Sequence, residues 1–255
     1  MEKKSFFISD FHLGTDGHLS SLEREKKIVR WLDQYAPQME HLYLLGDVFD
    51  YWFEYKRVVP KGFTRLLGKL AALRDDGVEI SYFTGNHDMW MFNYMQEEFD
   101  IPIFRKPIEK IIGGKHFLIG HGDGLGPGDY GYKFIKHIFA NRVCQWLFAR
   151  IHPNSAIALM KHFSRQSRMM TAEEPWMEDK EWLLKYCEEL ILSQPYDYMV
   201  FGHRHLPVYW RLSNDKSMYI NLGDWIYHYS YGIFDGSELS LQFFESDHEH
   251  LITNV

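Results

Sequence analysis

Five apolar runs of this chain each end in a short turn that carries aspartate, histidine or asparagine. The run 42–45 indicates a buried strand, and Gly46 ends it, so that Asp47 comes directly after the strand. In α/β folds, the carboxyl ends of strands form the sheet edge where ligands bind. We therefore expect all five turns to meet at one site. They are Ser9-Asp10-Phe11-His12, Gly46-Asp47, Gly85-Asn86-His87-Asp88, Gly120-His121-Gly122-Asp123 and Gly202-His203-Arg204-His205.

The order of the elements predicts the architecture. Strands are expected at 5–9, 42–45 and 78–83, with helices at 20–35 and 60–73 between them. This alternation implies a parallel sheet with right-handed crossovers. We expect one α/β domain over 1–255, with an insertion at 125–195 that forms a helical cap over the site. Beyond these elements, a hairpin is expected at 106–119, a helical block at 129–194, and strands at 198–201, 208–212, 218–221, 229–234 and 239–244.

Charge and hydropathy exclude some classes of function. The formal net charge of −7 gives no general reason to expect a nucleic-acid partner. No apolar run approaches the roughly 18–20 residues of a membrane span, and the one at the N-terminus is too short for a signal peptide. We therefore expect a cytoplasmic protein, with any membrane contact made from the surface.

The combination of turns predicts two metal ions. Each pair of polar residues alone is typical of an ordinary turn, but five such turns together indicate a shared site. Oxygen and imidazole donors without thiolates suit Mn²⁺, our first expectation, as well as Fe²⁺ or Zn²⁺. A bridging carboxylate offsets the repulsion between two cations, and Asp47 is placed to be that bridge. We assign Asp10, His12, Asp47 and His205 to one ion, and Asp47, Asn86, His121 and His203 to the other.

These motifs, in this order, resemble those of the calcineurin-like metallophosphoesterase superfamily over nearly the whole chain. The resemblance implies a double β-sandwich flanked by helices, with a dinuclear site at one edge of the sheets. It also implies that Asp47 and His87 are catalytic, with His87 stabilising the leaving oxygen or donating a proton to it. Asp50, Asp88 and Asp123 would support neighbouring ligands and loops.

Further features resemble the UDP-2,3-diacylglucosamine pyrophosphatase family of the lipid A pathway. These are the stretch Gly120-His121-Gly122-Asp123-Gly124-Leu125, the helical insertion, and Asn221-Leu222-Gly223-Asp224-Trp225. The resemblance implies cleavage of UDP-2,3-diacylglucosamine to UMP and 2,3-diacylglucosamine 1-phosphate. It places substrate contacts at Asn86, His87, Asp129, Tyr132, Arg165, Ser167 and Arg168.

The stretch 132–151 mixes aromatic with basic residues, which favours a surface that receives lipid at the cytoplasmic face of the inner membrane. Two features depart from the better-known members of the family: His87 stands where they have arginine, and 169–174 lacks an expected lysine. Two alternatives therefore remain. One is a metallophosphoesterase that acts on another nucleotide or nucleotide-linked lipid. The other is a non-catalytic scaffold, which is disfavoured because all seven ligand positions carry competent residues.

Overall fold

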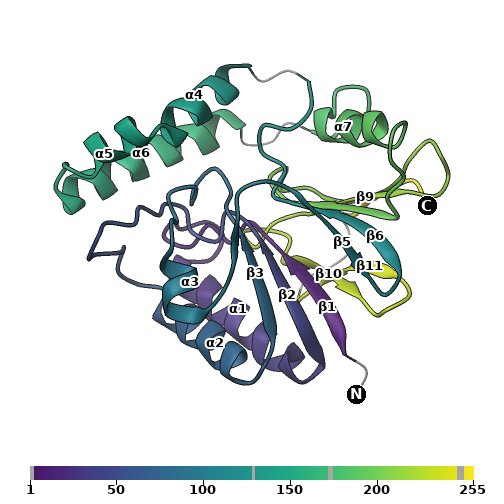
Figure 1. The fold of residues 1–255 in the computed structure, drawn as a ribbon, viewed down its shortest axis with the longest axis horizontal. Helices are drawn as coiled ribbons and strands as arrows, with labels where there is room; N and C mark the ends of the chain where they lie inside the picture. The colour runs from purple at the N-terminus through teal and green to yellow at the C-terminus, as the bar shows by residue number, and fades with distance from the viewer. Residues whose placement is uncertain (1–2, 128–129, 172–174, 246–249) are drawn as a thin grey trace.

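The computed structural model describes residues 3–127, 130–171, 175–245 and 250–255. Two six-stranded mixed sheets pack face to face, with helices on their outer faces (Figure 1). The predicted fold class is therefore confirmed. In the described residues, no helix is both long and apolar enough to cross a membrane.

The first sheet has the strand order β11-β10-β1-β2-β3-β4, and its central strands are parallel, as the alternating pattern predicts. Helices α1 and α2 cover its outer face, where Ile28, Trp31 and Leu70 are buried. The elements are β1 (Lys4–Ile8), α1 (Ser21–Tyr35), a 3₁₀ turn (Ala36–Gln38), β2 (Met39–Leu45), α2 (Thr64–Asp75), β3 (Glu79–Phe83), α3 (Tyr94–Phe99), β4 (Ile103–Phe104), β10 (Ser230–Phe234) and β11 (Leu239–Phe243).

The second sheet has the order β12-β8-β9-β7-β6-β5, with β6, β7 and β9 parallel at its centre. The predicted hairpin is present, because β5 and β6 pair antiparallel around the two-glycine turn Gly113-Gly114. Aromatic and aliphatic side chains from both sheets fill the space between them, including Phe7, Phe83 and Phe117. The strands are β5 (Ile108–Ile112), β6 (Lys115–Ile119), β7 (Tyr198–Phe201), β8 (Pro207–Arg211), β9 (Met218–Leu222) and β12 (Ile252–Thr253).

Four helices lie between β6 and β7, and they divide into two groups (Figure 1). Helix α7 (Trp182–Leu190) packs on the outer face of the second sheet, where Leu183 and Cys187 meet Met199. Helices α4 (Tyr130–Ala140), α5 (Arg142–Phe148) and α6 (Pro153–Thr171) instead lie over the loops at the edge of the sheets. We propose that these three helices alone form the cap, and that α7 completes the sandwich. The cap expected at 125–195 is longer than this proposed cap, because that range includes α7.

An aromatic cluster seats the cap on the main domain. Tyr51, Phe53 and Trp90 are buried there against Phe139 and Phe148 of the cap. The Trp90 indole nitrogen also donates to the Phe139 carbonyl at 2.8 Å. This cluster explains why the loop after β2 is rich in aromatic residues: its side chains form the contact surface for a separate helical layer.

Candidate dinuclear metal site

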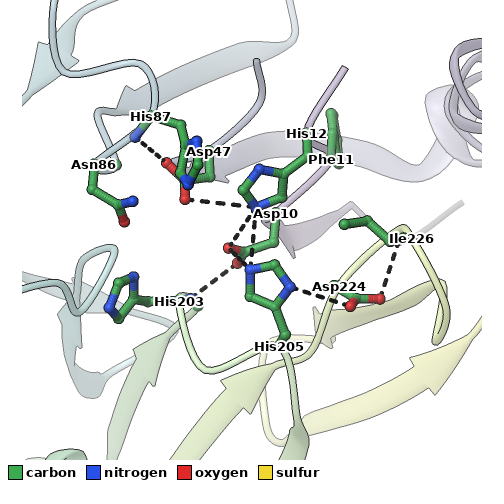
Figure 2. Close-up of polar contacts among 12 residues, drawn as sticks. Asp10, Phe11, His12, Asp47, Asn86, His87, His203, His205, Asp224 and Ile226 are labelled. Atoms are coloured by element: carbon green, nitrogen blue, oxygen red, sulfur yellow. Dashed lines mark hydrogen bonds and ion pairs between the residues drawn. The ribbon is translucent and has the colours of Figure 1, made fainter. Parts of the chain in front are cut away.

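The candidate residues come from strand ends in both sheets. Asp10, Asp47 and Asn86 follow β1, β2 and β3, which are neighbours in the first sheet. His121 and His203 follow β6 and β7, which are neighbours in the second. Because carboxyl ends of parallel strands meet at one edge, the two sheets present these residues to each other (Figure 2).

The backbone at this edge is strained. Asp10, His12, Asp47, His203 and His205 all have φ between 45° and 70°, in the left-handed region. This conformation is uncommon for residues other than glycine, and strain of this kind clusters at functional sites. Backbone hydrogen bonds hold two of these turns together: the Asp10 amide donates to the Gly46 carbonyl at 3.1 Å, and the His12 amide donates to the Asp47 carbonyl at 2.9 Å.

Two glycines let the turns approach each other closely. A Cβ atom at Gly85 would collide with the Asp47 carboxylate, and one at Gly202 would collide with the Asp10 carboxylate. Larger residues at these positions would therefore push the two aspartates out of the site. The glycines that precede Asn86 and His203 are thus required by the packing as well as by the turns.

The first cluster contains Asp10, His12 and His205. The Nε2 atoms of His12 and His205 are 3.1 Å apart, and Asp10 Oδ1 lies 3.2 Å from His205 Nε2. On the far side of each ring, Nδ1 faces a carboxylate: Asp50 at 3.5 Å for His12 and Asp224 at 3.3 Å for His205. A carboxylate favours the proton on Nδ1, which leaves both Nε2 lone pairs aimed at one point. Two nitrogens about 2.0–2.1 Å from one cation fit this spacing.

The second cluster contains Asp47, His121 and His203. His121 Nδ1 donates to the Leu45 carbonyl at 2.7 Å, so Nε2 is the ring nitrogen left to bind a cation in place of a proton. That atom lies 3.5 Å from Asp47 Oδ2 and 3.4 Å from the Asn86 side-chain oxygen. The His203 ring packs edge-on to the His121 ring, with centroids 5.1 Å apart.

The Asp47 carboxylate lies between the two clusters. Its Oδ2 atom is 3.6 Å from His12 Nε2 and 3.5 Å from His121 Nε2, while Oδ1 accepts a hydrogen bond from the His87 amide at 2.9 Å (Figure 2). One oxygen of a single carboxylate therefore faces both clusters. That Asp47 bridges two ions stays a prediction, and this position is compatible with it.

The electrostatics of the site suit cations. Burial alone would raise the pKa of the Asp10 and Asp47 carboxyl groups, but the surrounding histidines outweigh it and hold both pKa values below their usual range. Among the described residues, Asp10 Oδ1 is buried without a hydrogen-bond partner. Such an atom is costly unless something else compensates it. The Asp and His clusters thus fit a dinuclear metal site.

Residues behind the ligands fix their positions. Asp88 accepts hydrogen bonds from the Val48 and Gly85 amides and from the Tyr82 hydroxyl, so it joins the turns after β2 and β3. Asp123 binds Lys136 of the cap, with Oδ2 and Nζ 2.6 Å apart. The supporting roles expected for Asp50, Asp88 and Asp123 stay predictions.

Some supporting residues were not identified from the sequence. The buried Arg24 guanidinium donates to the carbonyls of Phe11, His12 and Thr15 and so holds the first turn from behind. Arg204, between the two histidines of the last turn, makes two hydrogen bonds to the buried Glu181 carboxylate. Asp224, which faces His205, was also not identified as a supporting residue. For this residue alone the sequence contained a signal, because the Asn221-to-Trp225 stretch follows a predicted strand as the other motifs do.

The predicted substrate contacts divide into two groups. Asn86 and His87 are at the site (Figure 2). Asp129 lies outside the described residues, and so do the side chains of Tyr132, Arg165, Ser167 and Arg168. All seven substrate assignments stay predictions.

Comparison with known proteins identifies relatives of this chain. A family model described as calcineurin-like phosphoesterase matches residues 4–207. A UDP-2,3-diacylglucosamine hydrolase from Porphyromonas gingivalis is 36% identical and covers 96% of this chain and 99% of its own. One of the same name from Aeromonas salmonicida is 27% identical, covering 87% and 85%. Among solved structures, the phosphoesterase Yfce from E. coli aligns at 16% identity and a TM-score of 0.48, covering 95% of this chain and 93% of its own.

Proposed function

Because this chain belongs to the calcineurin-like phosphoesterase family, we propose that it hydrolyses the pyrophosphate of UDP-2,3-diacylglucosamine. The products are UMP and 2,3-diacylglucosamine 1-phosphate, also called lipid X. The observation that carries the reaction type is the Asp47 carboxylate, one oxygen of which faces two separate clusters of metal-binding side chains. The substrate is supported by the hydrolases of that name, which match this chain over most of its length.

The residues of the site have separate tasks in this reaction. Asp10, His12, Asp47 and His205 would hold one divalent cation, and Asp47, Asn86, His121 and His203 the other. When bound, such a pair supplies Lewis-acid activation of water and neutralises charge on the phosphoryl oxygens. We propose Mn²⁺ as the native ion, with Fe²⁺ and Zn²⁺ as the other metals that suit this donor set.

We propose that His87 acts on the leaving group. Its Nδ1 donates to the Asp50 carbonyl at 3.0 Å, which leaves Nε2 as the ring nitrogen available to the site. The His87 ring packs edge-on to His12, with centroids 4.7 Å apart. We propose that Nε2 stabilises the leaving oxygen or donates a proton to it; because burial lowers the pKa of His87 to about 4, the protonated ring gives up its proton readily. Positioned proton transfer of this kind contributes about 10²–10⁴-fold to rate.

The cap supports a lipid substrate and a peripheral place at the membrane. Residues 130–171 contain seven lysines and arginines but no aspartate or glutamate, which leaves 21 basic residues against 35 acidic ones in the rest of the chain. The same segment exposes large apolar side chains: Phe134, Ile135, Val143, Trp146, Leu147 and Phe163 are each at least half exposed. Exposed apolar side chains in a segment that has basic but no acidic residues favour an anionic lipid interface, here the cytoplasmic face of the inner membrane.

Membrane binding can be tested with vesicles. We expect the protein to co-sediment with vesicles that contain anionic phospholipid, and high salt to weaken the binding. Replacing Trp146 and Leu147 together with serine should weaken it about tenfold or more, because both side chains would otherwise bury apolar area. The matched control is Leu192→Ser, which removes an exposed leucine outside the cap. Equal binding by all three proteins would refute the proposed surface.

The substrate is tested by direct assay. Enzyme loaded with Mn²⁺ should release UMP from UDP-2,3-diacylglucosamine, and it should act much more slowly on UDP-N-acetylglucosamine, which lacks the acyl chains that the cap would bind. Removal of the metal with a chelator should abolish both activities, and added Mn²⁺ should restore them. If the loaded enzyme left the diacyl substrate intact but hydrolysed simple phosphodiesters, the substrate assignment would be wrong.

One observation favours a second candidate within the same reaction class. His87 stands where better-known members of the pyrophosphatase family have arginine, and histidine is the general choice of the superfamily. The leaving group could therefore belong to another nucleotide-linked lipid. The same assay, run with other nucleotide diphosphate lipids, compares the two candidates directly.

A further inference from the structure

Among the described side chains of the cap, a serine hydroxyl reaches the catalytic residues. Along the part of α6 whose side chains are described, only Ala156 and Ser164 are buried, and Ser164 is 7% exposed. The Ser164 Oγ atom donates to Asp50 Oδ1 at 3.0 Å and lies 3.2 Å from His87 Nδ1. A side chain from the helical layer thus contacts both a residue behind the first cluster and the proposed leaving-group residue.

The directions of these hydrogen bonds define what Ser164 can do. The Asp50 carbonyl can only accept, so His87 Nδ1 carries the proton in the hydrogen bond between them. The Ser164 hydroxyl gives its own proton to the Asp50 carboxylate, and its oxygen lone pairs then face His87 Nδ1. The ring proton therefore has two acceptors, one from the main domain and one from the cap. Both hold the imidazole with Nε2 toward the site.

We infer that Ser164 is a positioning residue for His87, so that the leaving-group residue is fully oriented only when the cap is seated. This inference rests on the proposed function, and in particular on the proposed role of His87. Asp50 extends the connection, because its Oδ1 atom is also 3.5 Å from His12 Nδ1. One serine of the cap is thus connected to the leaving-group residue and, through Asp50, to a ligand of the first cluster.

The surroundings of Ser164 do not require a hydroxyl for packing. Among the described side chains of α6, Ile157 and Met160 also meet the main domain, and these apolar residues pack against the cluster of Tyr51, Phe53 and Trp90. Serine is also a weaker helix former than alanine. The hydroxyl group of Ser164 is therefore explained by its contacts with Asp50 and His87, and not by the stability of the helix or of the interface.

The test compares esters that differ in their need for help at the leaving oxygen. Ser164→Ala should lower kcat about tenfold for a phenyl phosphodiester, the loss expected for one hydrogen bond. For the activated p-nitrophenyl phosphodiester, kcat should stay within about twofold, because that leaving group departs without assistance. Ser164→Thr, which keeps the hydroxyl, should restore the rate on the phenyl ester. Ser155→Ala, at an exposed serine of the same helix, is the matched control and should change neither rate.

A double variant separates positioning from a structural role. In the His87→Asn background, Ser164→Ala should cause no further loss, because the residue on which it acts is gone. Additive losses, or an equal loss on both esters, would overturn the inference. Wild-type enzyme that hydrolysed neither ester with any of the three metals would instead count against the proposed function.

A measurement without turnover keeps the inference testable in that case. The ¹⁵N resonances of the His87 ring should shift in Ser164→Ala and remain unchanged in Ser155→Ala. Unchanged His87 resonances in both variants would overturn the proposed contact, whatever the enzyme hydrolyses.

Discussion

The Asp47→Asn protein is expected to lose at least about 10³-fold in phosphoesterase kcat and to bind no more than one metal ion per chain. Asparagine tolerates the left-handed backbone at this position and keeps an oxygen for the His87 amide, so the fold should be retained. What it lacks is the negative charge that offsets the repulsion between two cations. The loss of activity and of one metal ion would therefore report on the bridging charge alone. Metal analysis together with steady-state kinetics would measure both losses.

The matched control for this variant is Glu40→Gln, which changes an exposed carboxylate on the same strand, β2. It should retain two ions and full activity. If the Asp47→Asn protein bound two ions as tightly as the wild type, Asp47 would not be the bridge and the assignment of ligands to two clusters would need to be redrawn.

The second large effect is expected from His87→Asn. This change should lower kcat on UDP-2,3-diacylglucosamine by about 10²–10³-fold, within the range for loss of a positioned proton donor. Metal content should not change, because Nδ1 is engaged by the Asp50 carbonyl and the proposed ligand sets are complete without this ring. Kinetics and metal analysis on the same sample would distinguish loss of chemistry from loss of metal.

The control here is His116→Gln, at a histidine on β6 that contacts Tyr196 and Glu109 away from the site. It should leave kcat unaltered. A His87→Asn protein that lost its metal ions would show instead that His87 is a ligand, an arrangement compatible with its closeness to His12 and Asp47.

The prediction of the fold from the sequence worked where local pattern and chain order decide the outcome. Apolar runs with glycine breakers identified β1, β2 and β3, and their alternation with helices predicted the parallel pairing. The turns that follow those strands then fell at one edge. Local pattern also predicted most strands of the second sheet, but only the family resemblance predicted that two sheets pack into a sandwich.

The prediction was incomplete where contacts between distant residues decide the outcome. Helix α7 has the same helical pattern as its neighbours in the chain, and only its burial against Met199 distinguishes it from the cap. Arg24 is a charged residue in an ordinary amphipathic helix, and nothing nearby in the sequence indicates that it is buried. Ser164 is similar: its partners, Asp50 and His87, are 114 and 77 residues away along the chain.

The position of the site across two sheets has a consequence for the stability of the whole chain. Its proposed ligands come from the first 86 residues, at Asp10, Asp47 and Asn86, and from the second sheet, at His121 and His203. A pair of ions held by all of them would act as a cross-link between the N-terminal and C-terminal portions of the polypeptide. The two sheets could then not separate without first releasing the metal ions. Loss of metal would thus loosen the sandwich at its open end, so that catalytic competence and resistance to unfolding would rise and fall together.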